Sequence, residues 1–513
     1  MSNSSEIYDR YRKNRTQDVV NIAFLLFISV IFPIYMHNKY FDITVTRATV
    51  FTDGVIFYLV LIASSMAIEF FMLNYYSAGC ESWFYKDSKV IAMPDVWMLL
   101  FLAANVMAFF MAPNKEAAWT GSEGRRFGLA MILAVSLMFI FLARETCVNL
   151  LVFLGICISA AATDVIAILQ HFGYDPFDLR LKVIDKQKSM FISLFGNINT
   201  YSSYIAMVLP IFVAVYVFEK KKWVRIISSV FIILTSAAII PGKSDNVYLG
   251  LFAAFLVLFY ISISQKKIFE YVFAILLISV GLFAMSVLNE EFKGSQGHIN
   301  GIAENVQNPK IMFAFAVLMF VISAFVFVLK IKNNDLYFKI QSFRLMIICS
   351  VIFVVLLVGF IIYGVKAGLD LFQFNDKWGT YRGYIWRRGF DLFEMAPLKN
   401  KIFGYGNETI GRLMRANFYN EMVGVTGKKY DNCHNELLQY LVTTGIFGAV
   451  SYIGLFVSSI IYMLKRNDGN AIVIASIGAA VAYAAQGLVN LNQPITTPFY
   501  FVILAAGIGF IRY

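Results

Sequence analysis

One histidine stands where a polar loop gives way to an apolar run. In DNCHNELLQYLVTTGIFGAV, residues 431–450, no charge follows Glu436, and His434 is one of only four histidines in the chain. Asp431 has the side chain of a helix N-cap, which would place His434 at the third helical position. The positive end of the helix dipole would keep the ring neutral and able to accept a proton. We therefore predict a general base here; the alternative is amphipathic packing at a membrane interface.

Three arginines crowd the segment WGTYRGYIWRRGFDLFEMAPLKNKIFGYG, residues 378–406: Arg382, Arg387 and Arg388. If this segment is a helix, Arg382, Trp386 and Gly389 lie on one face. The planar fork of arginine suits bidentate binding of phosphate oxygens, so the segment could hold an anionic substrate. The alternative is a helix on the outer membrane surface whose arginines reach lipid head groups.

Other polar residues stand at the ends of apolar runs. Asn197 and Asn199 come just before one run, and Gln170 ends the run before it. Polar groups at that depth need partners, so they could bind sugar hydroxyls or could cap helices. In PGKSDNVYLGL, Lys243 could contact a substrate or could form a local pair with Asp245.

Several reaction types have no motif in this sequence. It contains no GxxxxGK[ST] loop for ATP, no D-x-D for a metal-bound nucleotide sugar and no GxSxG. The five cysteines show neither CxxC pairing nor metal-ligand spacing, so we expect isolated cysteines without disulfides. No metal and no cofactor is expected.

The elements that position these residues are apolar. Of the 513 residues, 59% are hydrophobic and 15% are charged, whereas about a quarter of a soluble domain is charged. Runs of roughly 20 apolar residues recur, and only helices satisfy their own backbone groups in lipid. We predict an all-α polytopic transmembrane bundle of about fourteen spans. Spans 1–11 occupy residues 1–366, an extracytoplasmic loop with amphipathic helices occupies 367–433, and spans 12–14 occupy 434–513, the first of them over 435–464.

The orientation follows from the short loops. One side receives the basic clusters Arg10 to Arg15, Lys220 to Arg225, Lys266 and Lys267, Lys330 to Arg344, and Lys465 and Arg466. The positive-inside rule makes this side the cytoplasm, with both termini on it and all four histidines outside. This arrangement explains the net charge of +11 without nucleic acid. Residues 367–433 are the exception, because this outer loop holds ten Lys and Arg against seven Asp and Glu.

Four stretches resemble, in order, the bacterial O-antigen ligase and O-antigen polymerase superfamily of polytopic membrane glycosyltransferases. They cover roughly residues 160–510. ILQHFGYDP is similar to its Q-x-F-G segment, and FGNINTYSSYIAMVLP to its G-N-x-N stretch. The third is the loop pattern of Arg382, Trp386, Pro397, Leu398, Gly404 and Gly406. The fourth is the histidine segment with His434, Asn435, Gln439, Gly445 and Gly448.

The resemblance implies glycan transfer from undecaprenyl diphosphate to an acceptor hydroxyl on the outer face of the bacterial cytoplasmic membrane. His434 matches the family's essential loop histidine and Arg382 its loop arginine. The expected substrate-binding residues are Arg387, Arg388, Lys243, Asn197, Asn199, Gln170, Trp386 and Asn435. The expected partners are the lipid-linked oligosaccharide, an acceptor glycan and membrane lipids, together with chain-length regulator and flippase proteins.

Two positions depart from the family pattern. Asp245 stands where the family has arginine, with only Lys243 nearby as a cation, and Thr443 and Thr444 replace the usual acidic residue before a glycine. About fourteen spans exceed the usual dozen of ligases, which favours a polymerase over a ligase. A flippase or transporter would show repeated halves and ionisable residues within spans, and a scaffold would not need His434 or Arg382.

Overall fold

The computed structural model describes residues 16–76, 91–294, 301–339, 341, 343–368 and 372–513. The amino-terminal basic cluster Arg10 to Arg15, Cys80 and His298 lie outside these residues. In the part described, every regular element is a helix and no strand occurs. The prediction of an all-α fold is confirmed.

Among the described residues, ten helical segments are long and apolar enough to cross a membrane. They are Thr16–Ile34 (α2, Thr16–Leu26; η1, Phe27–Ile31; α3, Phe32–Ile34), Ile43–Ile68 within α4 (Ile43–Tyr76), α6 (Met93–Met111), α9 (Leu150–His171), α10 (Ile198–Phe218), Lys222–Gly242 (α11, Lys222–Ala237, and α12, Ile239–Gly242), α13 (Asn246–Ser264), α14 (Ile268–Glu291), α16 (Pro309–Lys332) and α23 (Gly445–Lys465). Three shorter apolar helices accompany them: α8 (Leu129–Arg144), α24 (Ala471–Gly487) and α25 (Thr497–Arg512). A further long helix is α18 (Phe343–Lys366). The chain is a multi-pass membrane protein.

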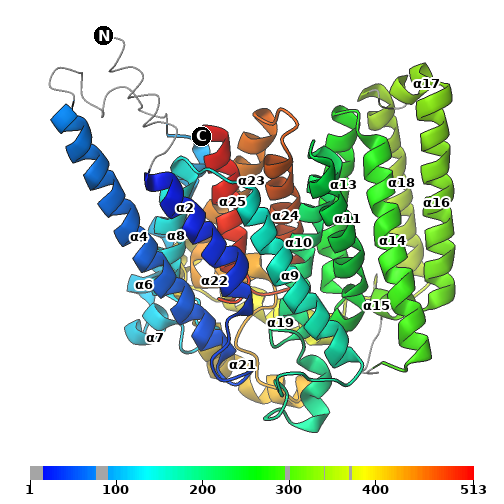
Figure 1. Cartoon of the computed structure of the whole chain (residues 1–513). Coiled ribbons are helices and arrows are strands. Elements are labelled where there is room, and N and C mark those ends of the chain that lie inside the picture. Colours follow the sequence, from blue (N-terminus) through cyan, green and yellow to red (C-terminus); the bar gives the residue numbers. More distant parts are fainter. Residues whose placement is uncertain (1–15, 77–90, 295–300, 340, 342, 369–371) are drawn as a thin grey trace.

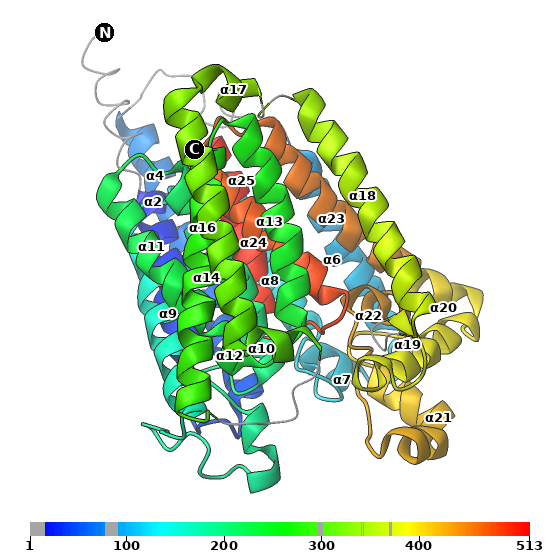
Figure 2. The same cartoon turned by 90° about the vertical axis from the view of Figure 1, so that its right-hand side faces the viewer.

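These helices run between two ends of the bundle (Figure 1). The start of α2, the short helix α17 (Asn334–Lys339) and the carboxyl terminus lie at one end, which we call the basic end because Lys220–Lys222, Lys330 and Lys465 are there. At the opposite end, the loop end, lie α7 (Lys115–Thr120), α15 (Ile302–Val306), α19 (Trp378–Glu394), α20 (Leu398–Phe403) and α21 (Ile410–Thr426), as Figure 2 also shows.

The centre of the bundle is α10. Almost all of its residues are buried, and it packs against α24, α13 and α11. Its amino end, with Asn197 and Asn199, lies toward the loop end. The side chain of Asn197 caps the helix by accepting a hydrogen bond from the Asn199 amide at 2.8 Å. The most buried helix therefore fixes two of the predicted site residues.

The predicted span 435–464 is wrong as a single helix. The structure breaks it at Thr444 into α22 (Glu436–Thr443) and α23, whose first residue, Gly445, has a φ of 68°. The left-handed conformation suits glycine, and a Cβ at Gly445 would lie 2.2 Å from the carbonyl oxygen of Ile402. A short helix at the loop end thus carries the histidine segment separately from the span that follows.

The turn at Gly404 and Gly406 holds the carboxyl end of α22. The amides of Tyr405 and Gly406 donate to the carbonyls of Val442 and Thr443 at 3.2 and 2.9 Å. The last carbonyls of a helix lack partners within the helix, and this turn supplies them. The two stretches that resembled the family therefore meet in space.

Candidate functional site

His434 does not lie inside a helix. The helix N-cap is Asn435, whose side chain accepts from the Leu438 amide, so the expectation that Asp431 caps the helix is wrong. His434 precedes the cap in a left-handed conformation with a φ of 46°. Asn432 is the reason, because its side-chain oxygen accepts the His434 amide at 3.0 Å in an Asx turn. Such a conformation is costly for a residue with a Cβ and must be held by its surroundings.

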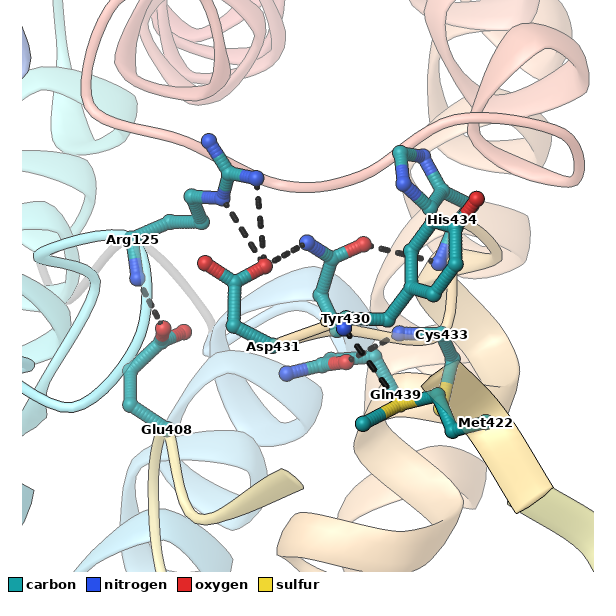
Figure 3. Close-up of polar contacts among 9 residues, drawn as sticks. Arg125, Glu408, Met422, Tyr430, Asp431, Cys433, His434 and Gln439 are labelled. Carbon is teal, nitrogen blue, oxygen red and sulfur yellow. Dashed lines mark hydrogen bonds and ion pairs between the residues drawn. The ribbon is translucent and has the colours of Figure 1, made fainter. Parts of the chain in front are cut away.

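A chain of polar contacts holds the histidine from the far side of the site (Figure 3). The guanidinium of Arg125 donates to Asp431 Oδ1 from Nε at 3.2 Å and from Nη2 at 3.1 Å. The same carboxylate oxygen accepts from the Asn432 side chain at 2.5 Å, and Asn432 holds the His434 amide. Arg125 belongs to the loop between α7 and α8, so a segment some 300 residues earlier in the sequence orients the histidine segment.

The imidazole ring has one accessible nitrogen. Nδ1 of His434 is buried and has no hydrogen-bond partner among the described residues, which leaves Nε2 as the nitrogen that a substrate can reach. The ring of Tyr430 meets the imidazole edge-on, with centroids 5.9 Å apart and planes at 80°. Tyr430 therefore limits the rotation of the ring.

Arg382 approaches the same histidine from α19. Gly379, Thr380 and Tyr381 are all left-handed, and this tight turn delivers Arg382 to the start of the regular part of the helix. Its Nη1 donates to the Gly379 carbonyl at 2.9 Å, and its Nε is buried without a partner among the described residues. A partly unsatisfied buried guanidinium is suited to bind an anion.

The electrostatics of the site keep His434 neutral. Burial, followed by the positive charges of Arg382 and Arg125, lowers the pKa of His434 to about 3. Burial also lowers the pKa of Arg382, which the neighbouring carboxylate of Asp245 opposes. The site therefore combines a neutral imidazole with two guanidinium groups.

Residues 307–453 match the family model described as O-antigen ligase. The match includes α19 to α22 and therefore both Arg382 and His434. This match supports membership of the O-antigen ligase and polymerase superfamily. No curated protein sequence matches it significantly.

Of the two predicted asparagines, Asn199 is connected to Arg382 and Asn197 is a helix cap. The Asn199 side-chain oxygen accepts from Ser244 at 2.7 Å and from Asn246 at 3.4 Å. Asn246 in turn accepts a long contact of 3.5 Å from Arg382. Asn199 is thus connected to the arginine through Asn246, whereas the side-chain oxygen of Asn197 caps α10.

Lys243 belongs to a different group of charges. The charges that lower the pKa of His434 are Arg382 and Arg125, and Lys243 is not among them. Burial and the nearby Arg180 lower the pKa of Lys243 to about 8. Asp245 accepts the Ala303 amide at 2.9 Å at the start of α15.

Other predicted binding residues have partners within the protein. Gln170 accepts the Ser193 amide at 2.7 Å and donates to Asp175 at 2.8 Å. Arg387 pairs with Asp376 at 2.5 Å. Arg388 pairs with Glu421 at 2.5 Å and also with Asp391.

Trp386 and Asn435 complete the set of predicted residues. The Trp386 ring packs on Trp378 with centroids 5.3 Å apart, and its Nε1 is buried without a partner among the described residues. Asn435 caps α22 through its side-chain oxygen.

Sequence reasoning missed Arg125, Asp431 as its partner, and Glu408. Glu408 is buried, accepts the Arg125 amide, and lies so close to Gly124 that a Cβ there would overlap its carboxylate. A second ion pair, between Glu123 and Arg412 at 2.6 Å, fastens the same two loops. The one signal in the sequence was an Arg125–Arg126 pair on the side that the positive-inside rule leaves poor in cations.

Cys147, Cys157 and Cys433 are free cysteines. Among the described residues, no three His, Cys, Asp or Glu side chains gather in a group that could hold a metal ion.

Proposed function

We propose that the chain is a polysaccharide polymerase that transfers a glycan from undecaprenyl diphosphate to a lipid-linked acceptor repeat on the outer face of the cytoplasmic membrane. The observation that supports this most is the placement of a neutral His434 between two guanidinium groups, Arg382 and Arg125. These groups match the two substrates, because the acceptor hydroxyl must lose a proton while the diphosphate of the donor gains negative charge.

In the proposed reaction the acceptor hydroxyl attacks the anomeric carbon of the donor glycan. The new carbon–oxygen bond forms as the bond to the diphosphate breaks, and the lipid diphosphate leaves with the bonding electrons. His434 Nε2 takes the hydroxyl proton as general base, which typically contributes about 10²–10⁴ in rate. Arg382 and Arg125 stabilise the charge that develops on the leaving group.

Binding of the diphosphate would also make His434 a better base. Its pKa is low partly because two positive charges stand nearby. A diphosphate between the guanidiniums offsets this repulsion and raises the proton affinity of the ring. The histidine then becomes basic in the complex, where its basicity is required.

The proposal assigns different tasks to the remaining predicted residues. Asn199 extends the polar surface next to Arg382 and is available to sugar hydroxyls. The salt bridges of Arg387 and Arg388 favour a structural role on α19. The internal hydrogen bonds of Gln170 favour a structural role in its loop. Asn197 and Asn435 act as helix caps. We also propose that Arg125, and not Lys243, supplies the second cation for the donor.

A ligase is the second candidate, because the matching family model is described as O-antigen ligase. Its chemistry at His434 and Arg382 would be the same, with a different lipid or a protein as acceptor. The acceptor therefore decides between the two functions.

The test is glycan transfer by the purified protein in liposomes that contain only the lipid-linked repeat. We expect glycan chains to lengthen with the wild type, and the rate to fall at least about 100-fold in His434→Ala and in Arg382→Ala. Lys399→Ala is the control, since Lys399 is an exposed cation of the same loop. Transfer only after a foreign acceptor lipid is added would identify a ligase. Full activity in both variants would refute the proposed site.

A further inference from the structure

A cavity of about 750 Å³ opens at the basic end of the bundle, far from His434. It lies along the seam between α6 and α23 and reaches the carboxyl end of α25. The helices α6 and α23 pack side by side (Figure 2). This volume is in the range of cavities that hold small organic ligands. We call it the seam cavity.

One wall of the seam cavity is apolar. Met93 and Trp97 come from α6, and Val457 and Ile461 from α23. Gly454 makes the close approach of the two helices possible, since a Cβ there would lie 2.3 Å from Cδ2 of the Trp97 indole. The exposed faces of Met93, Val457 and Ile461 offer a hydrocarbon surface between two membrane helices.

The other part of the seam cavity is cationic. Lys465, Arg466 and Arg512 line it at the ends of α23 and α25. Arg512 donates to both carboxylate oxygens of Asp95, at 3.1 and 2.7 Å. Three cations against this one carboxylate leave a net charge of +2. Within the described ranges, Lys465 and Arg466 take part in no ion pair.

An aromatic ring holds the cations in place. The guanidinium carbon of Arg466 lies 4.0 Å from the centroid of the Tyr462 ring, and that of Arg512 lies 5.3 Å from it. Arg512 also donates to the Tyr462 hydroxyl at 3.4 Å and to the Ala143 carbonyl at 2.9 Å. Cation–π contacts and these hydrogen bonds fix guanidinium groups that would otherwise be free to turn toward water.

We propose that the seam cavity binds one acidic phospholipid of the leaflet at the basic end. The phosphate of its head group contacts Lys465 and Arg466, and one acyl chain lies along Trp97, Val457 and Ile461. Charge complementarity selects an acidic lipid over a zwitterionic one, because the cationic part carries two uncompensated charges. The apolar wall selects a lipid over a soluble anion.

The proposal does not depend on the glycan-transfer function. The site lies at the opposite end of α23 from the histidine segment, so the failure of either proposal leaves the other standing.

Native mass spectrometry of the full-length protein, delipidated and then supplied with equimolar phosphatidylglycerol and phosphatidylethanolamine, tests the site. We expect one retained phosphatidylglycerol per chain in the wild type. The double variant Lys465→Gln/Arg466→Gln should lower that bound fraction at least fivefold. The matched control Lys220→Gln/Lys221→Gln removes the same charge from a loop at the same end outside the seam cavity and should change it little.

A second variant separates lipid binding from loss of charge. Ser458→Trp keeps every cation but fills the cavity that Ser458 lines, so it should release the lipid as well. If both variants retain phosphatidylglycerol as the control does, or if the wild type retains the two lipids equally, the proposal is overturned. Thermal stabilisation by phosphatidylglycerol, present in the wild type and absent in both variants, provides the independent readout.

Discussion

At the scale of single residues, the site depends on positive charge placed around a base. Arg382 and Arg125 approach His434 from two loops and help to lower its pKa to about 3. The imidazole of His434 is therefore neutral throughout the range from about pH 5 to 8, where an isolated histidine would titrate. Glu408 and Asp431 hold Arg125 in place, because Glu408 accepts its amide and Asp431 accepts its guanidinium.

Replacement of Arg125 by alanine tests the charge that the family match does not cover. We expect Arg125→Ala to lower the rate of glycan transfer by about 10²–10³, because a cation at the leaving group is lost and Asp431 loses its partner. Arg126→Ala is the matched control, since it removes the neighbouring arginine and should change the rate less than about threefold. Equal effects of the two substitutions, measured as initial rates at matched expression, would show a general loop effect instead.

The raised pKa of the Glu408 carboxyl predicts that the stability of the protein depends on pH. Burial raises the pKa of its carboxyl to about 7 from an ordinary 4.5, against the opposing hydrogen bond from the Arg125 amide. The folded state therefore binds a proton that the unfolded state has released, and the stability from this group is complete below pH 4.5 and lost as the pH rises through 7. A shift of this size corresponds to at most about 3 kcal/mol.

Glu408→Gln keeps a hydrogen-bond acceptor for Arg125 without the titration. We expect its melting temperature in detergent to match the wild type near pH 5 and to exceed it increasingly up to pH 8. Identical melting curves at both pH values would mean that Glu408 is ionised in the folded protein at neutral pH.

Residue types and order in the sequence predicted His434 and Arg382, which the structure places together, but could not predict Arg125. The contact between Arg125 and Asp431 joins positions 306 residues apart, and no periodicity or local spacing reports such a pairing. Arg387 and Arg388 show the converse. Their types suggested phosphate binding, yet Asp376 in the turn before α19 pairs with Arg387, and Glu421 on α21 pairs with Arg388.

At the scale of elements, the site is an arrangement of short helices whose contacts are set by glycine. The predicted face of α19 with Arg382, Trp386 and Gly389 is the face toward α22, since a Cβ at Gly389 would lie 2.9 Å from Leu438 and 3.2 Å from Cys433. The helix periodicity was therefore sufficient to predict which residues share a face with Gly389, and that this face has a functional role remains a prediction. The start of α22 was mispredicted because Asp431 and Asn435 are both good caps, and Asp431 is engaged by Arg125.

A larger side chain at Gly389 should force α19 away from α22. We expect Gly389→Val to destabilise the protein by about 1–3 kcal/mol and to lower the glycan-transfer rate at least about tenfold, because Arg382 moves with its helix. The control is Gly424→Ala in α21, where nothing lies within 4 Å of the added carbon. There alanine should stabilise by up to about 1 kcal/mol without altering the rate. A Gly389→Val protein that melts and reacts like the wild type would contradict the packing argument.

At the scale of the whole molecule, the hydrophobic runs predicted most helices to within a few residues. The apolar stretch on either side of Arg144 and Glu145 forms two helices, α8 and α9, separated at 145–149. Composition was sufficient here because a membrane span leaves few alternatives to a helix. Which side of the membrane each end faces is a separate prediction that rests on the charge of the loops.

The predicted sidedness can be measured with a membrane-impermeant maleimide on intact cells. In a variant that lacks the native cysteines, Asn420→Cys at the loop end should react, while Lys220→Cys at the basic end should react only after permeabilisation. Both positions are exposed, so poor access cannot explain a difference. The reverse pattern would place His434 in the cytoplasm and exclude the proposed donor side.

The link between the loop at Arg125 and the segment around Asp431 has a consequence for comparing such chains. The family match covers residues 307–453, yet a cation that acts on His434 comes from position 125, outside that region. Two relatives with equally good matches can therefore differ in the charge around the same histidine. Function should be assigned across such relatives only after the loop between α7 and α8, which contains Arg125, has been aligned as well.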